Sequence, residues 1–138
     1  MATLTRFEDI EAWQSARELA KGVYACSREG QFSRDFGLRD QIRDAAVSAM
    51  GNIAEGFERG GAAEIGQFLA IAKGPVGELE SHLYVAFDQN YVSAEVFAAL
   101  KEAAGRTKRL IAGFMNYLRR SGLRGVKFKK PAEAETRQ

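Results

Sequence analysis

Between Ala45 and Leu83 the chain repeats apolar residues at every third or fourth position. This spacing puts them on one side of an α-helix, because residues three and four apart lie on the same face of successive turns. Ser48, Asn52 and Glu55 follow one another at the same spacing along a flank of this stripe. The pattern therefore predicts packed helices and not a catalytic loop.

The composition agrees with a helical domain. The 138 residues are enough for one domain with a core of its own, and 46% of them are hydrophobic.

Cys26 is the only cysteine, so neither an internal disulfide nor a cysteine metal cluster can form within one chain. The N-terminus has no apolar signal core, and no apolar run approaches the roughly 20 residues that a membrane span needs. We expect a cytoplasmic protein that does not insert into membranes.

Apolar periodicity and capping residues predict four helices, at about residues 7–28, 34–59, 62–89 and 94–120. Ser33 and Ser93 are the expected N-caps of the second and fourth helices, and Gly60 ends the second. Pro75 falls inside the third, where we expect a kink and not a break. Short links force neighbouring helices to be antiparallel, so we predict an all-α, up-down-up-down four-helix bundle over residues 1–121, followed by a basic flexible tail over 122–138.

Two of these helices have more apolar surface than a bundle core requires. On the second and fourth helices, the apolar residues cover more of the helix circumference than a single core-facing stripe does. Contiguous exposed apolar surface usually marks a partner surface, so we expect a homo-oligomer. The expected interface residues are Ala46, Met50, Phe57, Phe97 and Met115. The alternative is a thick core that absorbs both arcs.

Four polar residues are expected at the seam between the second and third helices: Ser48, Asn52, Glu55 and Glu78. Buried polar groups need hydrogen-bond partners, and a satisfied network would fix the register of the two helices. The alternative is a metal-dependent enzyme built on Glu55, Glu78 and His82. Metal-binding bundles repeat a Glu-x-x-His motif, however, and this chain has a single histidine.

Other catalytic sets are missing from the sequence. His82 has no serine or cysteine partner in a recognisable arrangement, and Gly60-Gly61 lacks the lysine of a phosphate-binding loop. We therefore expect no enzyme activity, no cofactor, no metal and no small-molecule substrate.

Basic residues gather at the end of the chain. The last 20 residues hold seven basic against two acidic residues, a balance of +5, while the whole chain is only +2. Cations there would neutralise phosphates, and Phe128 would stack on a base. The candidate nucleic-acid-binding residues are Arg119, Arg120, Arg124, Lys127, Lys129 and Lys130. The alternative is a solvated terminus with no ligand.

The chain also resembles a known family of four-helix bundles. The family is named for proteins encoded within intervening sequences of 23S rRNA genes, and it includes accessory proteins of diversity-generating retroelements. The matching motifs are Trp13-Gln14, Ser48 with Asn52-Ile53-Ala54-Glu55-Gly56, Phe68-Leu69 with Ile71-Ala72 and Gly74, and Glu78-Leu79. The match covers about residues 7–118, with Pro75 where a serine is common and Ala49-Met50 in place of a more usual isoleucine-containing pair.

The resemblance implies a four-helix bundle that assembles into a ring-shaped homopentamer. In the retroelement branch it also implies binding to a reverse transcriptase and nucleic acid. The leading hypothesis is thus a non-enzymatic oligomer that binds RNA, DNA or a ribonucleoprotein. The second hypothesis is a protein-interaction scaffold without a nucleic-acid role.

Overall fold

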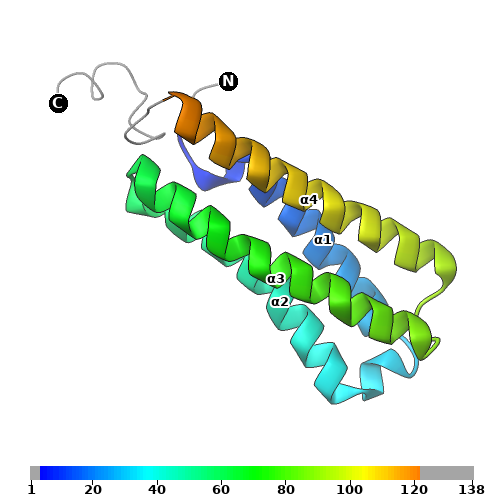
Figure 1. Cartoon of the computed structure of the whole chain (residues 1–138). Coiled ribbons are helices and arrows are strands. Elements are labelled where there is room, and N and C mark those ends of the chain that lie inside the picture. The colour runs from blue at the N-terminus through cyan, green and yellow to red at the C-terminus, as the bar shows by residue number, and fades with distance from the viewer. Residues whose placement is uncertain (1–3, 122–138) are drawn as a thin grey trace.

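Four long helices form the protein, which is represented by a computed structural model that describes residues 4–121. They are α1 (Glu11–Ser27), α2 (Phe36–Arg59), α3 (Ala62–Asp88) and α4 (Ala94–Ser121). Each helix packs on the next in chain order, and α4 returns to α1 (Figure 1). The predicted all-α, up-down-up-down bundle is confirmed. The expected tail, including Arg124, Lys127, Lys129 and Lys130, lies outside the described residues.

Aliphatic side chains from all four helices fill the core. Most residues of the apolar stripes on the second and third helices are buried, from Ile42 to Phe57 and from Ile65 to Leu83, whereas Leu38 and Phe68 of the same stripes are half-buried. Phe87 and Val96 lie at the same helical spacing as the buried residues of α3 and α4, but they are 38% and 37% exposed. Both lie at helix ends, beside the turn between α3 and α4.

The first helix starts later than predicted. A short 3₁₀ turn, η1 (Phe7–Asp9), comes before α1, and Ile10 between them is extended. The Asp9 carboxylate accepts the backbone N–H groups of Thr5 and Arg6, each at 3.2 Å. The Thr5 N–H is the main reason why the pKa of Asp9 is lowered. These local bonds hold a turn, so the α-helix begins only at Glu11.

The N-cap of α2 is Asp35 and not Ser33. A second 3₁₀ turn, η2 (Phe32–Arg34), contains Ser33, whose hydroxyl donates to the Gly30 carbonyl at 2.6 Å. The Asp35 carboxylate accepts the Leu38 N–H at 3.2 Å, as an N-cap does. Its other oxygen accepts the Tyr91 hydroxyl at 2.9 Å, which ties the start of α2 to the α3–α4 turn.

The end of α2 and the start of α4 lie where the sequence predicts them. Gly60 ends α2 in the left-handed conformation, at a φ of 94°. The Ser93 hydroxyl accepts the Val96 N–H at 3.1 Å, which confirms the predicted cap of α4. Helix α3 runs unbroken through Pro75. Within residues 4–121, none of the helices has both the length and the apolar character needed to cross a membrane.

Candidate nucleic-acid interface

The motif residues at the start of the chain fasten η1 to α1. The ring of Trp13 meets that of Phe7 edge to face, with 5.1 Å between the centroids. Beside it, the Gln14 side-chain amide donates to the Glu8 carbonyl at 2.8 Å. These two motif residues therefore have a structural role at the N-terminal end of the bundle.

The polar motif residues do not form the predicted network between α2 and α3. Asn52 donates through its side-chain amide to the Ser48 carbonyl at 2.8 Å and hydroxyl at 3.2 Å, both within α2. Glu55 and Glu78 are exposed, and each pairs within its own helix. Glu55 lies 2.7 Å from Arg59, and Glu78 lies 3.4 Å from His82. The seam network was the wrong interpretation, because the hydrogen bonds of these side chains stay within their own helix, at the i, i+4 spacing.

Close packing of α2 on α3 depends on Gly56 instead. A Cβ atom at this position would lie 2.6 Å from the Cβ of Phe68 and 3.5 Å from the Cα of Ile65. Only a glycine lets the two backbones approach this closely. The other motif glycine, Gly74, is exposed, and a Cβ there would meet nothing within 4 Å.

The expected oligomer-interface residues divide into two groups. Ala46 and Phe57 are each 1% exposed within the single chain. They belong to the core, as the thick-core alternative expected, and are not available to a partner in this fold. Met50, Phe97 and Met115 are half-buried and pack against the core from its edge. The assembly state itself stays a prediction.

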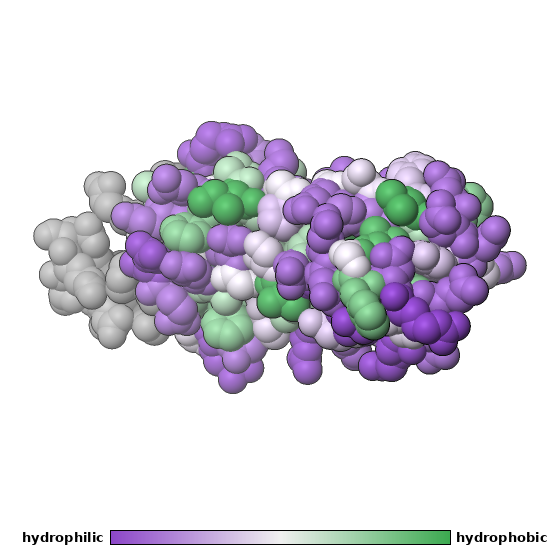
Figure 2. All heavy atoms as spheres, turned by 90° about the horizontal axis from the view of Figure 1, so that it is seen from below, coloured by the Kyte–Doolittle hydropathy of each residue, from purple (hydrophilic) through white to green (hydrophobic). Residues whose placement is uncertain are grey.

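Large apolar side chains are nevertheless exposed elsewhere on the bundle. Figure 2 shows apolar patches separated by hydrophilic residues on one face of the molecule. Near the α3–α4 turn, Phe97 packs against Tyr84 and Phe87, with 5.1 and 4.7 Å between ring centroids. Tyr84 is 50% exposed. We call Tyr84, Phe87 and Phe97 the aromatic cluster.

The basic side chains that the structure describes are concentrated on α4. This helix holds six basic residues against two acidic ones, a balance of +4, whereas α3 holds one basic against four acidic, a balance of −3. No acidic residue occurs on α4 from Ala103 to Ser121. The predicted Arg119 and Arg120 lie exposed in its last turn. Neither has an ion-pair partner within the described part of the chain.

Sequence reasoning missed three further cations on the same helix: Arg106, Lys108 and Arg109. Arg106 is exposed and has no ion-pair partner among residues 4–121. Arg109 pairs with Glu102 at 3.2 Å on the exposed surface. The signal that identifies them is the absence of acidic residues over the second half of the helix, which starts well before the terminal segment.

Lys108 has a different role, because it is held by Glu80 of α3. The Glu80 carboxylate lies 2.7 Å from Lys108 and 3.3 Å from Lys101. Burial raises the pKa of Glu80, but the hydrogen bonds from the two lysines outweigh it and leave that pKa below its ordinary value. This charge cluster fastens α3 to α4 and leaves both lysines less available to a ligand.

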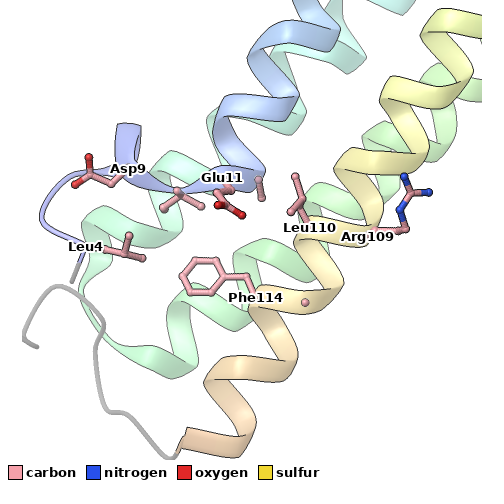
Figure 3. Close-up of a pocket in the computed structure, with 9 residues that line it drawn as sticks. Leu4, Asp9, Glu11, Arg109, Leu110 and Phe114 are labelled. Carbon is pink, nitrogen blue, oxygen red and sulfur yellow. The ribbon is translucent and has the colours of Figure 1, made fainter. Parts of the chain in front are cut away.

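A pocket of about 450 Å³ opens between the start of the chain and α4 (Figure 3). Its floor is apolar, with Phe114 extending from α4 toward Leu4, and Asp9 and Glu11 lie on the side of η1 and α1. Arg109 extends from the outer side of α4, away from the floor. No serine, cysteine, histidine or lysine is among the residues that line this pocket.

Chemistry elsewhere in residues 4–121 is also sparse. No group of three or more histidine, cysteine or acidic side chains is arranged to hold a metal ion. Burial raises the pKa of the Cys26 thiol to about 11, so the reactive thiolate is scarce at neutral pH. The arrangement that stands out is the exposed cationic face of α4.

Comparison with known proteins identifies the fold and the family. A crystal structure of a protein with unknown function from the S23 ribosomal protein family of Bacteroides thetaiotaomicron superimposes with a TM-score of 0.68. It is 20% identical, and the alignment covers 75% of this chain and 97% of the other. No curated protein is detectably similar to the chain. The family described as 23S rRNA-intervening sequence protein matches residues 8–113, and the chain belongs to this family.

Proposed function

We propose that the protein is a non-enzymatic homo-oligomer that binds nucleic acid, alone or in a ribonucleoprotein, through the basic end of α4 and the basic segment after it. The observation that carries this proposal is the half-helix from Ala103 to Ser121, which holds five basic residues and no acidic one. Three of these cations, Arg106, Arg119 and Arg120, have no ion-pair partner among the described residues.

Such a surface suits a polyanion. Each phosphate that an arginine neutralises releases condensed counterions, and this release supplies most of the affinity of sequence-independent binding. Assembly would strengthen it, because several copies of the same cationic face on one particle bind a long strand with a high effective concentration. The family resemblance suggests five copies; RNA, DNA and a reverse transcriptase complex are the candidate partners.

A salt-dependent titration tests nucleic-acid binding. Labelled RNA and DNA are titrated with the full-length protein at about 50 mM and about 200 mM salt, followed by fluorescence anisotropy. We expect binding that weakens strongly at the higher salt. A variant with Arg119, Arg120, Arg124, Lys127, Lys129 and Lys130 changed to Gln should lose it. Absence of binding at both salt concentrations overturns the proposal.

A matched control uses arginines at the other end of the bundle. Arg28 and Arg34 are exposed near the C-terminal end of α1 and the start of α2, and neither forms an ion pair among residues 4–121. Arg28→Gln/Arg34→Gln removes two charges, as Arg119→Gln/Arg120→Gln does. The first pair should leave the affinity near that of the wild type. Equal losses from both pairs would mean that only total charge matters.

The aromatic cluster favours a second candidate, a protein-interaction scaffold. Exposed aromatic groups are typical of protein interfaces, and those of this cluster gather at the α3–α4 turn, at the opposite end of α4 from Arg119 and Arg120. A partner protein that stays bound after nuclease treatment, and is released by Tyr84→Ser, would favour the scaffold. Sedimentation of the wild type at micromolar concentration tests self-association in either case, and a monomer there would contradict it.

A further inference from the structure

One exposed stripe of α4 is built differently from the rest of that helix. Its members are separated by three or four positions, so they lie in line along a single face: Arg106, Arg109, Gly113, Asn116 and Arg120. All five are exposed. At about 1.5 Å per residue, the line from Arg106 to Arg120 is roughly 21 Å long. It is long enough to lie beside several consecutive phosphates of a strand.

Gly113 makes a hollow at the centre of this stripe. It lines the pocket beside Arg109 and also a second, shallower one of about 360 Å³ beside Asn116 and Arg120. A Cβ atom on Gly113 would meet nothing within 4 Å, so the fold does not require a glycine here. A glycine inside a helix costs about 1 kcal/mol relative to alanine. What it provides is bare helix backbone between two arginines, open to close approach.

The charged residues around the hollow lie on two sides, and those on α4 are Arg109 and Arg120. Asp9 and Glu11 lie across the pocket, on η1 and α1. The Asp9 carboxylate is already bonded to the N–H groups of Thr5 and Arg6. Arg109 extends outward from α4, away from these carboxylates (Figure 3). An anionic strand along the outer face of α4 therefore meets arginine side chains and the Asn116 amide.

We propose that this face of α4, centred on Gly113, holds the phosphodiester backbone of a bound nucleic acid. Arg106, Arg109 and Arg120 neutralise phosphates, Asn116 donates a hydrogen bond, and Gly113 leaves room for the strand. The inference rests on the proposed function and adds a site on the folded bundle to the basic segment beyond it. It also assigns a role to Glu102, which competes with phosphate for Arg109.

The test compares one substitution at two open helix positions in the full-length protein. Gly113→Glu fills the hollow and adds a negative charge. Gly77→Glu makes the same change on α3, where a Cβ also meets nothing within 4 Å. With a labelled RNA at about 100 mM salt, we expect Gly113→Glu to weaken binding about tenfold, and Gly77→Glu to have little effect. Circular dichroism and sedimentation establish that both variants keep the wild-type fold and assembly.

Two further variants test the roles of single charges. Arg106→Gln should lower the slope of log affinity against log salt by about one, as expected for one lost phosphate contact. Glu102→Gln should raise the affinity about twofold to threefold, because it frees Arg109. A merely structural role for Glu102 predicts no gain.

The outcomes separate the two proposals. If the wild type binds no nucleic acid, both proposals fail. If the wild type binds, the six-residue Gln variant and the single variants decide between the proposals. A loss confined to the six-residue variant, with the affinity unchanged in Gly113→Glu, Arg106→Gln and Glu102→Gln, means that the site on α4 is wrong. The proposed function then stands. Equal weakening by Gly113→Glu and Gly77→Glu also overturns the site, since charge alone would then account for the loss.

Discussion

The hydroxyl oxygens of Ser15 and Thr107 lie 2.7 Å apart in the buried seam between α1 and α4. The Thr107 hydroxyl also donates to the Ala103 carbonyl of its own helix at 2.9 Å. Because Thr107 uses its proton in that bond, Ser15 donates to Thr107. The pair is the only hydrogen bond between these two helices that joins buried side chains within residues 4–121, and it places one helix opposite the other at a defined register.

Removing Thr107 alone should cost more than removing both members of the pair. Thr107→Val keeps the shape but deprives the buried Ser15 hydroxyl of its acceptor, and we expect a loss of about 1–2 kcal/mol in the free energy of unfolding. Ser15→Ala combined with Thr107→Val leaves no unsatisfied group and should recover part of this loss. Urea unfolding of the two single variants and the double variant measures the coupling. Strictly additive effects would contradict it.

Gly56 and Gly77 should respond in opposite ways to alanine. At Gly56 the new methyl group would lie 2.6 Å from the Phe68 Cβ, so α2 and α3 must separate. We expect Gly56→Ala to destabilise the protein by about 1–2 kcal/mol, even after the gain in helix propensity. Gly77→Ala meets open space and should stabilise it by up to about 1 kcal/mol. Thermal unfolding monitored by circular dichroism compares the two. A stabilising Gly56→Ala would mean that the helices do not approach closely there.

Asp35 should be the more sensitive of the two candidate caps of α2. Asp35→Ala removes the acceptor of both the Leu38 N–H and the Tyr91 hydroxyl, and we expect a loss of about 2 kcal/mol. Tyr91→Phe removes the second bond alone and should cost about half as much. Ser33→Ala removes only a bond inside η2 and serves as the control. If Ser33→Ala proves the more costly change, the assignment of the cap is wrong.

Helix positions and the main core stripes were predictable because they follow from local periodicity. Ile42 to Phe57 and Ile65 to Leu83 repeat with the helical period, and a sustained apolar repeat of this kind is typical of a helix face that packs against a core. The choice between Ser33 and Asp35 was not predictable in this way. Both residue types cap helices well, and Tyr91, which favours Asp35, is 56 residues away in the sequence.

The predicted seam network and two of the five predicted interface residues were wrong, because a helical projection does not show how neighbouring helices pack. Ala46 and Phe57 look superfluous on a helical projection, yet both are 1% exposed within the single bundle. Glu55 and Glu78 occupy suitable positions for a seam, but each carboxylate is exposed and pairs with the residue four positions later on its own helix. Of the candidate nucleic-acid residues, Arg119 and Arg120 were found from local charge. Arg106 and Arg109 were missed because apolar residues separate them from the basic terminus.

Glu80 should make the stability of the bundle depend on pH. Its pKa in the folded protein lies below the ordinary value of 4.5, because the lysine hydrogen bonds outweigh burial. The carboxylate therefore contributes stability that is fully present above about pH 5 and is lost as the pH falls through the folded-state pKa. We expect Glu80→Gln to lower the free energy of unfolding by about 1 kcal/mol at pH 7, and this disadvantage should shrink as the pH falls below the ordinary pKa of 4.5 and through the folded-state pKa. Urea unfolding across this pH range measures the difference in stability.

Glu102→Gln is the control, because it breaks an exposed ion pair whose carboxylate side chain is 74% accessible, and it should change stability little at pH 7. A Glu80→Gln variant whose stability follows the same pH dependence as the wild type would show that the cluster of Glu80, Lys101 and Lys108 does not stabilise the contact between α3 and α4.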